Sequence, residues 1–127
     1  MAKIIPPTKP TAAELNLLRV LWLLGPATVK QAHQVMQAER PDITYATVLR
    51  QMQIMHSKGL LTRDESERSH VYAPAQSQNA LQTGLLKELI HKAFSGSGKA
   101  LVLAALRGHV TKEERAEIQK ILHGEDR

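Results

Sequence analysis

Hydrogen-bonding side chains of three kinds lie close together just before the midpoint of the chain. They are the hydroxyls of Thr44 and Thr47, the guanidinium of Arg50, and the carboxamides of Gln51 and Gln53. An arginine can donate two hydrogen bonds to guanine and a glutamine can pair with adenine, whereas hydroxyls and the free amides of a helix start suit phosphate. These residue types therefore predict recognition of double-stranded DNA.

One helix must carry these side chains. Thr44 is a good N-cap residue and Gly59 a good stop. Between them Val48, Met52 and Met55 form an apolar stripe at helical spacing. That stripe would anchor the helix on a core and leave Ala46 and the polar side chains outside, as a helix lying in the major groove requires.

Two further helices precede it. Thr11 and Glu14 form a capping box, and a predicted helix runs from there to Gly25-Pro26. Its expected inward stripe is Leu15, Leu18, Leu21 and Trp22. The same box recurs at Thr28 and Gln31 and opens a short helix with an expected inward stripe of Ala32, Val35 and Met36. Lys30 stands near its start, where it is placed to clamp a phosphate. Residues 27–29 allow no more than a single bridge of strand.

After Gly59 the spacing of the apolar residues changes from that of a helix to that of extended strands. Residues 60–64 and 70–73 are short β-prone runs around a polar loop that carries Arg68, so a hairpin is expected. The order helix, bridge, helix, helix, hairpin is that of a winged helix-turn-helix. Arg68, at or near the wing tip, would reach either the backbone phosphates or the minor groove. The fold class expected is mainly α with a small β-hairpin wing.

The remainder of the chain is predicted to be helical and to form a dimer. Residues 100–106 are apolar on every side, and Thr111 with Glu114 opens a last helix. A second copy is the simplest cover for so much apolar surface, which predicts a homodimer. The side chains expected at its interface are Leu81, Leu85, Leu89, Phe94, Leu101, Val102, Leu106, Ile118, Ile121 and Leu122. The division expected is an N-terminal arm (1–10), a winged helix domain (11–75) and a dimerisation segment (76–127).

The composition of the chain limits the classes of function that it can have. The 127 residues carry a net charge of +5, which suits a polyanionic partner, and the 21 residues from Ile43 to Arg63 include three basic side chains and no acidic one. With no cysteine, disulfides and cysteine-based zinc sites are excluded. Neither a signal peptide nor a membrane span is indicated, so a cytoplasmic protein without membrane contact is expected.

Other classes of function find less support. No nucleophile–base pair, glycine-rich phosphate loop or carboxylate cluster suggests an enzyme or a cofactor, and the six histidines lack the spacing of metal ligands. The few aromatic residues form no stacking platform for RNA. The main alternative is a winged-helix module that contacts proteins without binding DNA, because fold alone does not determine function.

The chain resembles the penicillinase and methicillin-resistance repressors from about Thr11 to Leu122. The resemblance rests on the order and spacing of several short segments, none of them specific alone. They are TAAELNLLRVLW (11–22), TYATV (44–48), KGLL (58–61), RSHVYAP (68–74), FSGS (94–97) and TKEE (111–114).

The resemblance implies a homodimeric repressor with interlocking C-terminal helices and two winged domains on a palindromic operator. The matching reading-helix positions are Thr44, Tyr45, Ala46, Thr47, Arg50 and Gln51, and the matching wing residue is Arg68.

In members that respond to antibiotics, the resemblance also implies a sensor protease as a partner in induction, which cuts an Asn-Phe bond. Ala104 and Ala105 stand at the matching positions here, so the cleavage dipeptide is missing. Two further departures are Leu49, where some members carry a basic residue, and Glu67, where the wing usually has glycine. The operator preference of other members therefore does not transfer.

Overall fold

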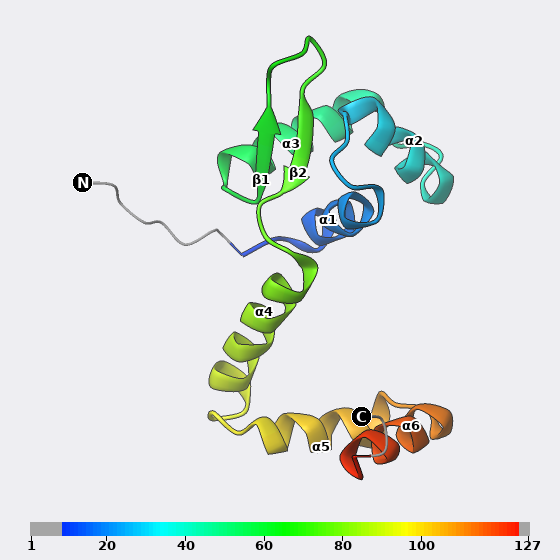
Figure 1. The fold of residues 1–127 in the computed structure, drawn as a ribbon, viewed down its shortest axis with the longest axis vertical. Coiled ribbons are helices and arrows are strands. Elements are labelled where there is room, and N and C mark those ends of the chain that lie inside the picture. The colour runs from blue at the N-terminus through cyan, green and yellow to red at the C-terminus, as the bar shows by residue number, and fades with distance from the viewer. Residues whose placement is uncertain (1–8, 125–127) are drawn as a thin grey trace, which may run out of the picture. The chain divides into compact units, whose positions relative to one another are not determined.

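The computed structural model describes residues 9–124, so most of the expected N-terminal arm lies outside the described residues. The chain divides into two compact units, the first ending at Leu81 and the second beginning at Gln82. The first unit contains α1 (Ala12–Leu24), α2 (Val29–Glu39), α3 (Tyr45–Ser57), β1 (Leu61–Asp64) and β2 (Val71–Pro74). The mainly helical fold with a small hairpin is confirmed (Figure 1).

Side-chain caps define where the first three helices begin. Thr11 with Glu14 and Thr28 with Gln31 form the expected capping boxes at α1 and α2. At α3 the Thr44 hydroxyl accepts the Thr47 amide. Gly59 adopts φ +85°, a left-handed conformation that favours glycine, and so ends α3 and turns the chain into β1.

The hairpin is antiparallel, with Leu61 opposite Pro74 and Asp64 opposite Val71. Ala27 forms an isolated bridge with Tyr72, exchanging both backbone hydrogen bonds at 2.9 and 2.8 Å. This single bridge is the one expected for residues 27–29, and it ties the α1–α2 connection to the hairpin. The wing is therefore anchored at its base, while its loop projects beyond the helices (Figure 1).

The core of the first unit lies between α1, α2, α3 and the base of the hairpin. Val48, Met52 and Met55 are fully buried, as the stripe on α3 predicts. The stripe expected on α1 needs correction. Leu17 and Val20 are buried beside Leu18 and Leu21, whereas Leu15 and Trp22 are only half-buried. On α2, Ala32 and Met36 point inward as expected, but Val35 is exposed. The buried face of α2 is the stripe of Val29, Ala32 and Met36, and Val35 lies outside it.

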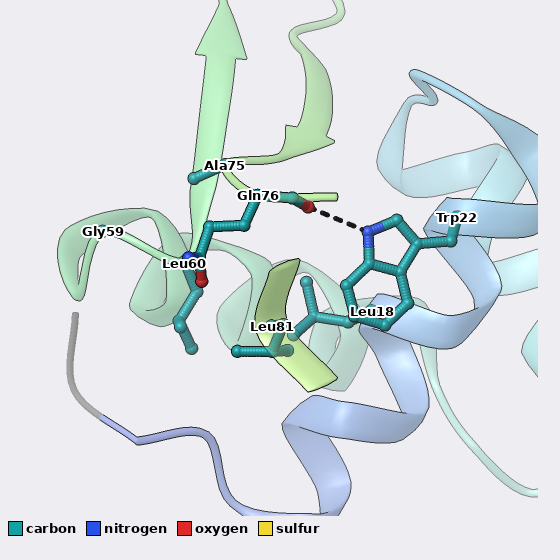
Figure 2. Close-up of a pocket in the computed structure, with 7 residues that line it drawn as sticks. All are labelled: Leu18, Trp22, Gly59, Leu60, Ala75, Gln76 and Leu81. Carbon is teal, nitrogen blue, oxygen red and sulfur yellow. Dashed lines mark hydrogen bonds between the residues drawn. The ribbon is translucent and has the colours of Figure 1, made fainter. Parts of the chain in front are cut away.

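α4 (Gln78–Ala93) begins inside the first unit. The Trp22 indole N–H donates to the Gln76 carbonyl at 3.0 Å, just before the helix starts (Figure 2). Leu81 is buried at 9% exposure and lines a small cavity with Leu18, Trp22 and Leu60. Leu81 was expected at the dimer interface, but it packs within its own chain because it falls on the first turn of α4, against α1.

The second unit contains the rest of α4 with α5 (Gly98–Gly108) and α6 (Lys112–Leu122). Ser97 caps α5, and Thr111 with Glu114 forms the expected capping box at α6. None of the residues from 82 to 124 is buried. In the part of the chain that the structure describes, no helix is long and apolar enough to cross a membrane.

Candidate nucleic-acid interface

The first turn of α3 is the most open part of the predicted site. Thr44, Tyr45, Ala46 and Thr47 are all exposed. The Thr44 hydroxyl is engaged, because it accepts the Thr47 amide at 3.1 Å and donates to the Thr47 hydroxyl oxygen at 2.9 Å. The hydroxyl hydrogen of Thr47 is thus directed away from Thr44 and can be donated to a ligand. Thr44 acts as the cap, and Thr47 keeps a hydroxyl hydrogen that is not used within this turn.

His33 positions the start of α3, a role that the sequence did not indicate. Its Nε2–H donates to the Ile43 carbonyl at 2.9 Å, since a carbonyl can only accept. Its ring edge also meets the Tyr45 ring, with centroids 6.0 Å apart and planes at 89°. His33 thus contacts one side of the Tyr45 ring, and Tyr45 is still 48% exposed. Spacing along the chain could not reveal this contact, because ten residues separate His33 from Ile43.

The outer face of α3 lies between two hollows. On the wing side, Tyr45 and Arg68 line a hollow together with Leu49, Gln53 and His70. On the α1 side, Thr47, Arg50 and Gln51 line a groove together with Arg40. The predicted residues are thereby brought together in two groups. Lys30, Thr44 and Ala46 line neither hollow, although all three are exposed.

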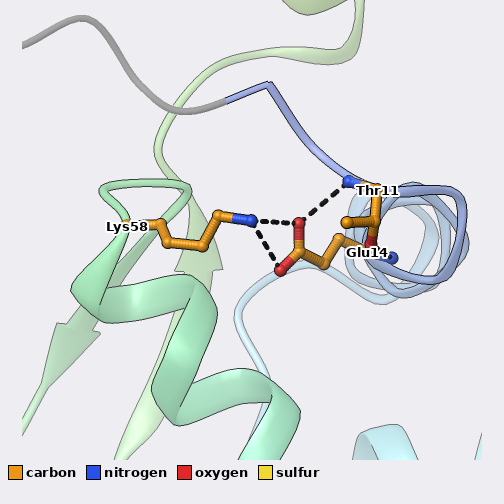
Figure 3. A network of polar contacts seen from close by, with 3 residues as sticks. All are labelled: Thr11, Glu14 and Lys58. Carbon is orange, nitrogen blue, oxygen red and sulfur yellow. Dashed lines mark hydrogen bonds and ion pairs between the residues drawn. The ribbon is translucent and has the colours of Figure 1, made fainter.

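The basic stretch from Ile43 to Arg63 is less available than its composition suggests. Lys58 donates to both oxygens of Glu14 at 2.7 and 2.9 Å, and Arg63 pairs with Glu65, its Nε donating at 2.6 Å (Figure 3 shows the Lys58 contact). Two of the three basic side chains are thus neutralised by carboxylates from outside the stretch. Arg50 is exposed and forms no side-chain hydrogen bond or ion pair within the described residues, so it carries the uncompensated charge.

Arg68 is the exposed basic residue of the wing loop. From residue 63 to residue 70 the wing has two arginines against three carboxylates. The hydrogen bond from Arg63 lowers the pKa of Glu65, and the Ser66 amide, at 2.9 Å from the carboxylate, lowers the pKa of Asp64. Both carboxylates therefore stay ionised, and Arg68 is the arginine of the wing that has no carboxylate partner among the described residues.

These features define the first unit as a winged helix-turn-helix domain, with α3 in the place of the reading helix. The family model of the penicillinase repressor matches residues 10–124. The chain belongs to that family and is a transcriptional repressor by class. It is 28% identical over 97 residues to the transcriptional regulator BlaI of Mycobacterium tuberculosis, in the sequences from strains CDC 1551 / Oshkosh and ATCC 25618 / H37Rv, covering 76% of this chain and 70% of each relative.

Proposed function

We propose that this repressor binds a palindromic DNA operator as a homodimer, with residues 11–75 as the DNA-binding domain and 76–127 as the dimerisation segment. The observation that carries the proposal is the two-faced construction of α3. Its inner stripe is fully buried, while Tyr45, Ala46, Thr47 and Arg50 are exposed on the outside. A helix anchored in this way presents its donors to base edges at little further cost in backbone ordering.

The second unit supports the dimer. None of its residues from 82 to 124 is buried, yet several large apolar side chains on its three helices are more than 40% exposed. They are Leu86, Leu89, Val102, Leu103, Ile121 and Leu122. Helices with so much open apolar surface have no core of their own, and a symmetric second copy is the commonest cover in soluble proteins. A dimer also supplies the two-fold symmetry that a palindrome matches.

The test is selection of bound sites from random duplex DNA by the full chain. We expect two inverted half-sites whose centres lie about one helical turn, roughly 10 base pairs, or a multiple of a turn apart. Affinity for the selected duplex should fall steeply as salt rises, because phosphate contacts release counterions. No enrichment, with no retention on heparin at low salt, would favour the winged-helix module that contacts proteins instead. A single, unrepeated half-site would contradict the palindrome while leaving DNA binding intact.

A further inference from the structure

The α1-side groove contains an arginine that sequence analysis did not single out. Arg40 lies in the connection between α2 and α3, and it lines the groove with Thr47, Arg50 and Gln51. Its backbone is held firmly. The Arg40 amide donates to Met36 at 2.9 Å, and its carbonyl accepts from Ile43 at 3.0 Å. The base of this side chain is therefore positioned relative to α3, although it precedes the helix.

The charges around the groove leave both of its arginines uncompensated. Glu14 also lines the groove, but the residue is 5% exposed and its carboxylate is neutralised by Lys58 (Figure 3). Arg40 and Arg50 are exposed, and neither forms a side-chain hydrogen bond or ion pair within the described residues. Among nearby acids, Glu39 pairs with Arg19, and Asp42 is exposed but does not line the groove.

The wing flank is weaker by comparison. Arg68 faces the wing-side hollow, but the wing as a whole has three carboxylates against two arginines. A helix that lies in a major groove about 12 Å wide has a phosphate backbone on each side of it. A wing that supplies one arginine on one side leaves the opposite strand without a matching contact, unless another part of the domain provides it.

We propose that Arg40 binds a backbone phosphate of the duplex on the α1 flank of α3, opposite the wing; this rests on the proposed function. A guanidinium matches the geometry of phosphate oxygens, and Thr47 offers its hydroxyl hydrogen on the same side. The groove is open, and Glu14, the buried polar residue in its lining, is already paired with Lys58, which suits an extended polyanion better than a free anion. Arg40 thus positions the reading helix without reading sequence.

The test compares Arg40→Gln and Arg40→Lys in the full chain, with Arg107→Gln as the matched control. Arg107 is exposed on α5 in the second unit, and its loss changes the net charge equally. Arg40→Gln should weaken binding to the selected operator and to unrelated duplexes alike, about tenfold near 0.1 M salt. The slope of log affinity against log salt should flatten by about 0.9 per protomer. Arg40→Lys should restore most of the slope, and melting temperatures should not change.

Each other outcome overturns the assignment in a distinguishable way. If the parent binds with a salt dependence and Arg40→Gln behaves like Arg107→Gln, Arg40 contacts no phosphate and the proposed function stands. If Arg40→Gln alters preference at particular base pairs, Arg40 reads bases instead. If the parent shows no salt-dependent binding, the inference fails together with the proposed function. If inorganic phosphate binds the parent but not Arg40→Gln, while both proteins bind the duplex equally, the groove is a small-anion site.

Discussion

Glu14 is a buried carboxylate that joins the start of α1 to the end of α3. Lys58 donates to both of its oxygens, and the Thr11 amide donates to one of them at 2.9 Å (Figure 3). We expect Lys58→Met to lower the free energy of unfolding by about 2–4 kcal/mol, because it leaves a buried carboxylate unpaired. Urea unfolding measures this loss. The double variant Glu14→Gln with Lys58→Met should recover part of it, and a double variant as unstable as Lys58→Met would contradict this account.

The same pair predicts a pH dependence of stability. Burial by itself would raise the pKa of Glu14, but the hydrogen bonds from Lys58 and Thr11 prevail and the pKa is lowered. The folded state therefore binds the proton less readily than the unfolded chain. Its contribution is fully present above the unfolded pKa, about 4.3, and is lost as the pH falls through the lower folded value. Glu14→Gln should reduce the acid dependence of the free energy of unfolding, as measured by urea unfolding at a series of pH values.

Truncating Arg50 and truncating Arg68 should change DNA binding in different ways. Arg50 lies on the outer face of α3, so Arg50→Ala should cost about 1–3 kcal/mol at one or two base pairs and relax specificity there. Arg68 stands on the wing, so Arg68→Ala should weaken binding evenly across sequences and flatten the salt dependence. Binding to a panel of single-substitution operators at several salt concentrations separates the two patterns. The roles are reversed if Arg68→Ala is the variant that changes sequence preference.

At the scale of elements, the sequence predicted those features whose residues lie close together along the chain. The capping boxes place both partners within three residues, and the stripe on α3 repeats within one helix, so these signals survive in the sequence alone. For the candidate site, the sequence placed the predicted side chains on α3 and on the wing loop, and their binding to DNA stays a prediction. The pairing of Lys58 with Glu14 was not, because 44 residues separate them and any surface carboxylate would have fitted the pattern equally well. Arg40 was missed for the same reason: its nearness to Arg50 comes from the fold.

Trp22 holds the segment just before α4 through its indole N–H, and this contact can be tested. Trp22→Phe keeps most of the ring but removes the donor to Gln76, so we expect a loss of about 1 kcal/mol. Because the lost bond lies just before α4, amide hydrogen exchange should quicken most from Ser77 to Leu81 (Figure 2). Leu23 is 78% exposed on the same helix, and Leu23→Ala should alter neither quantity. Uniform acceleration across the first unit would mean that Trp22 supports the whole core.

At the scale of the whole molecule, the two units differ in how they are stabilised. The first has a buried core, whereas the second has no buried residue between 82 and 124. Only the first unit therefore has the construction of a domain that can fold as a single copy. If the second unit gains its core by pairing, any process that separates its copies also weakens binding to a palindrome, without touching a DNA contact. Release of the operator would then need no cut at an Asn-Phe bond, which Ala104 and Ala105 do not provide.

Val102 allows that coupling to be tested in the full chain. It lies on α5 and is 50% exposed in a single copy, so Val102→Glu should not disturb the fold of one chain. In a dimer that covers this side chain, however, the substitution places a charge in an apolar interface. We expect ultracentrifugation at micromolar concentration to show the parent at about twice 14.1 kDa and Val102→Glu as a monomer. Affinity for the palindrome should fall by about 100-fold or more as the tethering of two half-sites is lost, while affinity for an isolated half-site stays the same.

Lys99→Glu is the control, since it makes a larger change of charge at an exposed polar position on the same helix. It should remain dimeric. If Val102→Glu were monomeric yet bound the palindrome like the parent, the two half-sites would not be coupled through the second unit, and repression would have to end through the DNA-binding domain itself. If both variants stayed dimeric, the interface would lie on a face of α5 that does not include Val102, and the exposed Ile121 and Leu122 of α6 would be the next positions to charge.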